Sequence, residues 1–223
     1  MLTFDPSPAA LKRRFKQRCT DTNNVFQNWQ IRVHRSLSWS LRAVGLAESH
    51  PEAELLFHWI AFNSLYGKWD AERNVPAVDN TSRNEFLRAF VRAGGEPCRV
   101  FLVERKAVLK KLLGSPYLST MFWRDPKAPR AASLATAELY KLDGMLSAKQ
   151  EARVFELAFE RVFVFRGQLV HGASSGGSRL NRSTLTASLE WMRDAVPLVQ
   201  YLTIEHGAHN DWPDLCYPPI VSA

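Results

Sequence analysis

The chain has 223 residues, of which 46% are hydrophobic and 11% aromatic, and its formal net charge is +7. This composition can bury a substantial core, which excludes a generically disordered protein, and the length fits a single domain. The positive charge favours an anionic partner such as nucleic acid, although many proteins carry a similar charge for solubility alone.

The cysteines and the apolar runs indicate a compartment. Cys19, Cys98 and Cys216 lie far apart with no C-x-x-C spacing. Their scatter argues against a disulfide framework or a zinc site and fits a reducing cytoplasm. The N-terminal stretch lacks the apolar core of a secretory signal, and no apolar run approaches the roughly 20 residues that span a bilayer. We therefore expect a cytoplasmic protein with no membrane partner.

Two helices are predicted first. A short basic helix is expected over residues 9–18 and a long amphipathic helix over residues 22–45. Apolar residues at steps of three and four form one stripe of the longer helix: Phe26, Trp29, Val33, Leu37, Leu41 and Val44. The other side is mostly polar and contains Arg32, Arg35, Ser36 and Arg42. The stripe should therefore face the core.

The next helix is predicted to be the centre of the domain. Its sequence is ESHPEAELLFHWIAFNSLYGKW, residues 48–69. Ser49 followed by Glu52 forms a capping box, and Pro51 suits the first turn. Apolar residues from Leu55 to Tyr66 cover nearly the whole circumference, which is typical of a buried helix.

Further helices follow in the second half of the chain. One is expected through Phe86 to Val91 with a cap at Thr81 or Ser82. The others are expected at residues 100–113, 131–145, 148–172 and 183–205, the last with a bend at Pro197. Residues 122–130 contain two prolines and should be largely irregular.

No alternating strand pattern or internal repeat is present in the sequence. We therefore predict an all-α fold, a bundle of seven to nine helices around the segment centred on Trp59. Residues 1–223 should form one domain, with a helical core over about 22–205 and an extended tail over 206–223.

An arginine and a histidine interrupt the apolar helix of VFVFRGQLVHGASSGG, residues 162–177. Arg166 and His171 are five residues apart, so they point about 140° from each other on a helix. Gly167 lies on the strip between them. A glycine inside a helix costs about 1 kcal/mol relative to alanine, and close approach of another backbone or of a ligand phosphate is one compensation.

Such a pair suits cleavage of an RNA phosphodiester. An imidazole that titrates near neutrality can remove the proton from a 2′-hydroxyl or protonate the leaving oxygen. A guanidinium can hold the phosphate and stabilise the charge that develops on it. The 2′-hydroxyl is an internal nucleophile, so no metal or other cofactor is required. The same spacing also occurs by chance in many helices, where a histidine at the end only contacts the free carbonyls.

Two motifs resemble a known family. RGQLVHG after an apolar helical run is similar to the R-x4-6-H signature of the HEPN superfamily. LLFHWIAFNSLYG is similar to the early helix of the Apea-like HEPN branch, which carries a W-x-A-F-x-x-L-Y run. The two motifs occur in the expected order, and the likeness spans about residues 22–205.

The resemblance implies an all-helical protein that forms a homodimer, with the Arg-His motifs meeting at the interface. Many members of the family are metal-independent endoribonucleases that act as toxins or in phage defence. Arg166 takes the place of the family arginine and His171 that of the histidine, so these are the predicted catalytic residues. Gly167 stands where the family commonly has a polar residue such as asparagine.

Other residues are candidates for substrate binding. Arg179 and Arg182 follow the glycine- and serine-rich loop and either contact the RNA backbone beside the cleft or are simply solvated. His58 and Asn63 lie on the predicted central helix, where polar groups need internal partners. If Asn63 faces the dimer cleft, it can orient His171 or a phosphate. The histidines of EHGAH, residues 205–209, have no third ligand nearby, so no metal site is predicted.

Two other interpretations stay open. The chain can be a catalytically inactive HEPN dimer that serves as an RNA-binding or protein-interaction module. It can also be the toxin of a toxin-antitoxin pair, silenced by a cognate antitoxin, which in this superfamily is commonly a nucleotidyltransferase-like protein. A small-molecule enzyme finds little support, because no carboxylate pair or nucleophile constellation is present.

Overall fold

The computed structural model describes residues 4–22, 27–47, 49–173, 177, 182–208 and 212–217. Within these ranges the chain forms eleven α-helices, one short 3-10 helix and one two-stranded hairpin. The predicted all-α class is confirmed. The predicted number of helices is too low, because two expected helices are each divided and a short helix occupies a segment predicted to be irregular.

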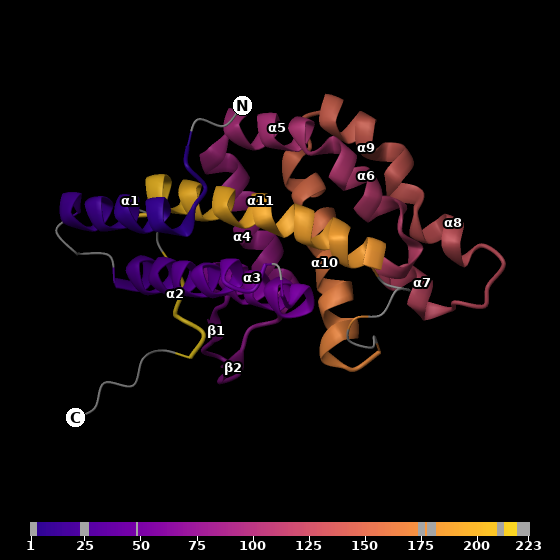
Figure 1. Ribbon diagram of the computed structural model, residues 1–223, viewed down its shortest axis with the longest axis horizontal. Coiled ribbons are helices and arrows are strands. Elements are labelled where there is room, and N and C mark those ends of the chain that lie inside the picture. The colour runs from indigo at the N-terminus through magenta and orange to yellow at the C-terminus, as the bar shows by residue number, and fades with distance from the viewer. Residues whose placement is uncertain are drawn as a thin grey trace.

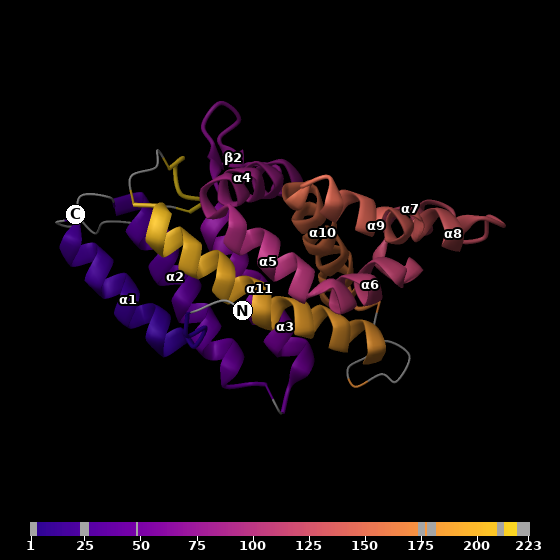
Figure 2. The same cartoon turned by 90° about the horizontal axis from the view of Figure 1, so that it is seen from above.

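A helical hairpin and a long crossing helix form the centre of the fold. α2 (Gln27–Val44) and α3 (Pro51–Tyr66) pack along each other. α11 (Arg182–His206) lies between α1 (Pro8–Asp21) and the later helices, as Figure 1 and Figure 2 show. α10 (Glu151–Val170) crosses behind α11, and its last turns extend past α3 at one side of the molecule (Figure 1).

The start of α3 differs from the prediction. Pro51 is the first helical residue, but the N-cap is His50, whose side chain makes no capping hydrogen bond. The Ser49 hydroxyl shares a hydrogen bond of 2.8 Å with Nδ1 of His50. Glu52 accepts a 3.1 Å hydrogen bond from the backbone N–H of Gly177. The predicted capping box is therefore wrong, since the Glu52 carboxylate binds the backbone of Gly177 instead.

α3 is the central helix, but one of its sides lies at the surface. Its buried apolar residues are Leu55, Trp59, Ala61, Phe62, Leu65 and Tyr66. The ring of Phe62 stacks on Phe159 of α10, with ring centroids 3.9 Å apart. Leu56, Phe57 and Ile60 remain partly exposed, and Asn63 is exposed. The predicted burial of the whole circumference is therefore only partly correct for a single chain.

Some residues on the predicted polar side of α2 are buried, whereas Leu41 and Val44, at the end of its predicted core-facing stripe, are 56% and 53% exposed. Ser36 and Ser40 accept hydrogen bonds from Nε2 of Gln200 in α11, at 2.8 and 2.7 Å. Arg32 is 1% exposed. Its guanidinium donates to the backbone carbonyls of Leu65, Gly67, Pro213 and Asp214. Burial lowers the pKa of Arg32 to about 10, so it stays protonated at neutral pH and ties the C-terminal segment to the end of α3.

The helices after α3 begin and end differently from the prediction. α4 (Asp79–Gly94) begins before Thr81, and the Ser82 hydroxyl donates to the carbonyl of Val78, the residue that precedes the helix, so neither predicted cap is used. The helix predicted over 100–113 is divided into α5 (Glu96–Glu104) and α6 (Lys106–Gly114). Arg105 separates them, with backbone angles of φ −96° and ψ 13°, and its guanidinium binds Asp194 of α11 at 2.7 Å.

The helix predicted over 131–145 is also divided. α8 (Ala131–Ala135) and α9 (Ala137–Ser147) are separated by Thr136, whose backbone angles are φ −106° and ψ 10°. Before them, η1 (Pro116–Leu118) and α7 (Thr120–Arg124) replace part of the predicted irregular segment. α7 and α8 project from the body of the molecule in both views (Figures 1 and 2).

A short hairpin follows α3. β1 (Trp69–Asp70) pairs antiparallel with β2 (Val75–Pro76). Strands of two residues are too short for an alternating pattern, which is why the sequence did not predict them. Lys68 also bridges to Leu215 of the C-terminal segment. No helix within the described ranges is long and apolar enough to cross a membrane.

Candidate active site

The candidate site lies at the end of α10. His171 is the C-cap residue of this helix, and its side chain is exposed. Gly172 has φ +69° and donates its N–H to the carbonyl of Leu169 at 3.2 Å, while Ala173 donates to Gln168 at 2.9 Å. These two bonds form a Schellman motif, which fixes the direction in which the chain leaves the helix. The imidazole of His171 is therefore presented to solvent from a well-defined helix end.

Arg166 lies beside a buried tyrosine. It is partly buried and makes no hydrogen bond or ion pair with any residue that the structure describes. Burial and the neighbouring Asp79 raise the pKa of Tyr66 well above its usual value, and the positive charges of Arg83 and Arg166 oppose this rise. The guanidinium of Arg166 is thus close to the corner where α3 ends and α4 begins, with its donors free to bind an anion.

A second arginine is buried at the same corner. Arg83 of α4 is 1% exposed, and its guanidinium lies over the ring of Phe163 in α10, 5.4 Å from the centroid. Its Nη2 donates to the side chain of Asn80. Its Nε and Nη1 have no hydrogen-bond partner among the described residues. No pattern in the sequence predicts the burial of Arg83, because a polar helix start of this composition is ordinarily solvated.

The strip between Arg166 and His171 is open. Phe163 packs its ring on Trp59, with centroids 5.8 Å apart, and Val170 is 52% exposed. No atom lies within 4 Å of the position that a Cβ would take on Gly167. The expected close approach of another backbone therefore does not occur within the described part of the chain, which leaves space for a ligand or a second chain.

The predicted substrate-binding residues are not all brought together. Asn63 is exposed and lies one turn before Tyr66, so the expectation of an internal partner for it is wrong. Arg182 is the exposed first residue of α11. Gly177, in the loop before it, contacts Glu52, which is about 17 Å along α3 from Asn63. Arg179 lies outside the described residues.

His58 is buried, but neither of its ring nitrogens has a hydrogen-bond partner among the described residues, so the internal hydrogen bond expected for it is not formed there. Its Nε2 is 3.5 Å from a carboxylate oxygen of Glu54, and both residues are buried. Arg193 of α11 binds both Glu54 oxygens at 2.7 Å. Burial raises the pKa of Glu54, but the contacts with His58 and Arg193 outweigh this, and the net shift is downward. This cluster holds α3 to α11 and contains neither Arg166 nor His171.

Two further features lie away from the Arg-His pair. A cavity of about 610 Å³ opens beside α4 and the end of α11, and its lining includes Tyr66, Phe86, Phe90, His206 and Trp212. Within the described ranges no group of three or more histidine, cysteine or acidic side chains is arranged to hold a metal ion. Neither the cavity nor the described histidine, cysteine and acidic side chains indicate a cofactor site next to Arg166 or His171.

Comparison with known proteins gives no match. A scan against protein-family models, a search of the curated proteins and a search of the solved structures all find nothing similar to this chain. A function for the chain therefore depends on its own geometry and on the two motifs in its sequence.

Proposed function

We propose that this protein is a metal-independent endoribonuclease of the HEPN type, with an active site that a second copy of the chain completes. One observation carries the proposal. Arg166 and His171 lie at the same accessible end of α10, and neither side chain makes a hydrogen bond or ion pair with a described residue. A buried or paired side chain at either position would leave no group to meet a phosphate.

The chemistry follows from the two groups. Arg166 binds the scissile phosphate and stabilises the charge that develops on it. His171 removes the proton of the 2′-hydroxyl or protonates the leaving 5′-oxygen. The 2′-oxygen then attacks the phosphorus, the bond to the 5′-oxygen breaks, and a 2′,3′-cyclic phosphate forms. Two histidines, one from each copy, separate the roles of base and acid.

The exposed side of α3 supports a second copy. Leu56, Phe57 and Ile60 are apolar and only partly covered in the single chain, and Asn63 continues the same side of the helix. A two-fold dimer uses the same patch on both chains. In Figure 1 the last turns of α10 pass next to α3. We expect a dimer paired through this side of α3 to bring the ends of the two α10 helices to its interface.

Gly167 supports an alternative proposal. The chain has no polar side chain there to bind a phosphate, and nothing in the described residues occupies the space. A catalytically inactive HEPN dimer that binds RNA or a protein fits that feature. A toxin held silent by an antitoxin is a further form of the main proposal, and in each form the protein is cytoplasmic.

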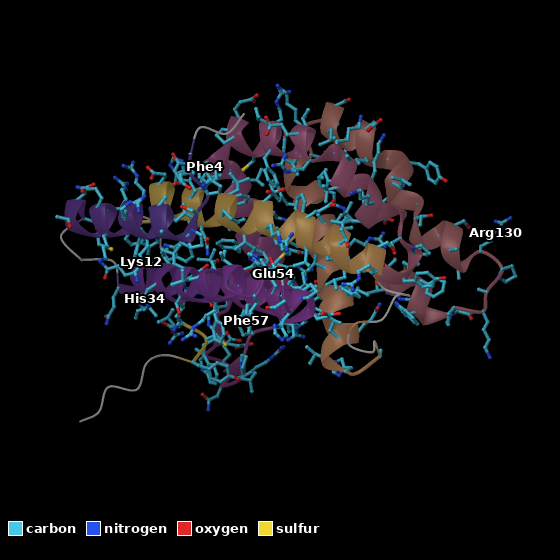
Figure 3. The ribbon with its side chains drawn as sticks, viewed as in Figure 1. Phe4, Lys12, His34, Glu54, Phe57 and Arg130 are labelled. Atoms are coloured by element: carbon cyan, nitrogen blue, oxygen red, sulfur yellow. The ribbon has the colours of Figure 1, made fainter. Side chains whose placement is uncertain are left out.

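A ribonuclease assay with EDTA present tests the proposal. Wild type should cleave single-stranded RNA, while His171→Ala and Arg166→Ala should lose at least about a hundredfold in rate. His34→Ala and Arg42→Ala are matched controls, because both side chains are exposed on α2, away from α10 (Figure 3 labels His34). Equal cleavage by wild type and all variants contradicts the proposed enzyme. The absence of cleavage by wild type on varied RNAs contradicts it as well.

A second measurement tests the shared cleft. Chains carrying Arg166→Ala and His171→Ala are co-expressed with different tags, and the mixed dimer is purified through both tags. The mixed dimer contains one intact Arg166 and one intact His171, so it should recover part of the activity that each variant homodimer lacks. A monomeric mass for wild type by light scattering contradicts the two-chain site.

A further inference from the structure

An exposed aromatic cluster stands next to the end of α10. It belongs to the segment of residues 116–130, which contains η1 and α7 and is called here the aromatic arm. Tyr117 is 53% exposed and Trp123 50% exposed. Phe122 packs edge-on against both rings, with centroids 5.1 and 5.2 Å away. The three neighbouring rings form an exposed aromatic patch, and such patches commonly mark an interaction site.

Two hydrogen bonds hold the start of the arm against α10. The backbone carbonyl of Tyr117 accepts one hydrogen bond from Nε1 of Trp123, at 2.9 Å, and another from Nε2 of Gln168, at 2.8 Å. Both acceptor positions of this carbonyl are thus used. The first bond fixes the Trp123 ring relative to Tyr117, and the second attaches the arm to α10. The exposed rings are therefore presented at a fixed place.

That place is next to the catalytic histidine of the proposed function. Gln168 and His171 are three residues apart and share one face of α10, with an axial rise of about 4.5 Å between them. The backbone carbonyl of Tyr117, and with it the start of the arm, thus lies on the side of α10 toward which His171 points. Arg166 lies around the helix toward α3 and α4, so the arm and that corner flank the candidate site on opposite sides.

The arm also carries unpaired positive charge. Arg124, Lys127 and Arg130 are exposed, against one acidic residue, Asp125. Lys127 and Arg130 make no ion pair with any described residue. Arg130 lies at the far end of the projection, where Figure 3 shows it directed into solvent. Exposed rings beside a row of cations are the two elements with which proteins bind single-stranded nucleic acid.

We propose that the aromatic arm is the binding platform for single-stranded RNA, on which unpaired bases stack against Tyr117 and Trp123 while the cations contact phosphates. The proposal deepens the proposed function and rests on it only for the direction in which the strand leads to His171. A duplex offers no free base faces to these rings, so the substrate class is single-stranded. A second copy of the chain is a poorer occupant, since a two-fold contact would bring the same three cations together.

Binding is measured by fluorescence anisotropy of a labelled 12-nucleotide single-stranded RNA with the His171→Ala protein, which separates binding from cleavage. Adding Trp123→Ala or Tyr117→Ala should weaken binding at least about fivefold for each ring removed. Trp123→Phe keeps a ring and should retain most of the affinity. Tyr140→Ala is the matched control, because Tyr140 is 83% exposed but lies on α9, outside the arm.

Two further readouts test the same site. Lys127→Gln should lower the slope of log affinity against log salt by about 0.7. The same RNA annealed to its complement should have the same affinity for the protein with both rings as for the Trp123→Ala variant. Circular dichroism of each variant establishes that the fold is kept.

The outcomes separate this proposal from the nuclease. Unchanged RNA affinity in both ring variants overturns the platform even if Arg166 and His171 prove essential for cleavage. RNA affinity that depends on Tyr117 and Trp123, together with no cleavage by wild type, supports the platform and contradicts the proposed nuclease. A loss of dimer mass in Trp123→Ala shows that a second copy covers the arm, which also overturns the platform.

Discussion

The hydroxyl of Tyr66 donates a 2.8 Å hydrogen bond to Oδ1 of Asp79 and so joins the end of α3 to the start of α4. Tyr66 is 3% exposed, and Oδ2 of Asp79 is buried without a hydrogen-bond partner among the described residues. Arg83 and Arg166 lie close enough to act on the tyrosine. This bond therefore holds the corner beside which Arg166 is presented.

Tyr66→Phe should destabilise the protein by about 1–3 kcal/mol at neutral pH, because it leaves the Asp79 carboxylate without its buried donor. Chemical denaturation at pH 7 measures this. If Arg166 depends on the corner for its position, cleavage falls as well while the dimer mass is kept. Tyr140→Phe, at an exposed position, is the control for loss of a hydroxyl.

The same bond predicts an alkaline transition. The pKa of Tyr66 is raised in the folded protein, so the folded state holds this proton more tightly than the unfolded state. The resulting stability is fully present below the unfolded pKa of about 10 and is lost as pH rises above it, with a slope of at most about 1.4 kcal/mol per pH unit. Wild type should therefore lose stability more steeply above pH ~10 than Tyr66→Phe does. Parallel profiles for the two proteins contradict the raised pKa.

Arg193→Met should also destabilise the protein, by about 1–3 kcal/mol, because it leaves the buried Glu54 carboxylate with only the longer contact to His58. Arg193 is 45% exposed, so solvent screening keeps the loss below that of a fully buried pair. The pKa of Glu54 is lowered in the folded protein. Its stabilisation is thus present above the unfolded pKa and is lost as pH falls through the folded pKa.

The difference between Arg193→Met and wild type should accordingly be largest at neutral pH and narrow below pH ~4. Arg99→Met provides a matched control. It breaks an ion pair with Glu96 in which both side chains are largely exposed, and it should change stability by less than about 1 kcal/mol. If the two substitutions lower the free energy of unfolding equally, the burial of Glu54 contributes nothing to the strength of its ion pair with Arg193.

The sequence predicted the parts of the fold that depend on local pattern. The apolar periodicity of α2, α3, α10 and α11 gave their existence and approximate ends. It did not give the break at Arg105, whose guanidinium binds Asp194, a residue distant in sequence. It also missed the burial of Arg32, whose acceptors include the carbonyls of Pro213 and Asp214. Contacts between distant segments leave no periodic signal.

The candidate site was predictable to the same extent. Arg166 and His171 could be identified because they lie close together on one helix. Arg83 and the aromatic arm could not, because the fold brings them to α10 from other segments. Asn63 was expected to be enclosed because its helix is apolar all round, yet its side of α3 is uncovered in the single chain.

Arg83→Met is expected to leave stability unchanged within about 1 kcal/mol or to raise it. Removing a buried charge destabilises a protein when it strands a partner charge, and replacing one by an apolar side chain of similar volume is often neutral or stabilising. Arg83 makes no ion pair with a described residue, and two of its nitrogens have no partner. Thermal unfolding measures the change. A loss above about 3 kcal/mol means that the guanidinium is paired in the folded protein.

Gly167→Ala separates stability from function at the centre of the candidate site. No atom lies within 4 Å of a Cβ on Gly167, so the methyl group fits, and alanine should stabilise α10 by about 0.5–1 kcal/mol. The same methyl group stands in the strip between Arg166 and His171, where the proposal puts a phosphate or the second chain. Cleavage or dimer affinity should therefore fall while the free energy of unfolding rises.

Gly144→Ala is the matched control for this prediction. Gly144 also lies inside a helix, α9, with no atom within 4 Å of a Cβ. Its substitution should give a similar gain in stability and leave cleavage and dimer mass unchanged, because α9 lies away from the end of α10. If Gly167→Ala behaves like Gly144→Ala in every measurement, the open strip is not occupied during the reaction, and Arg166 and His171 do not act on one phosphate across it.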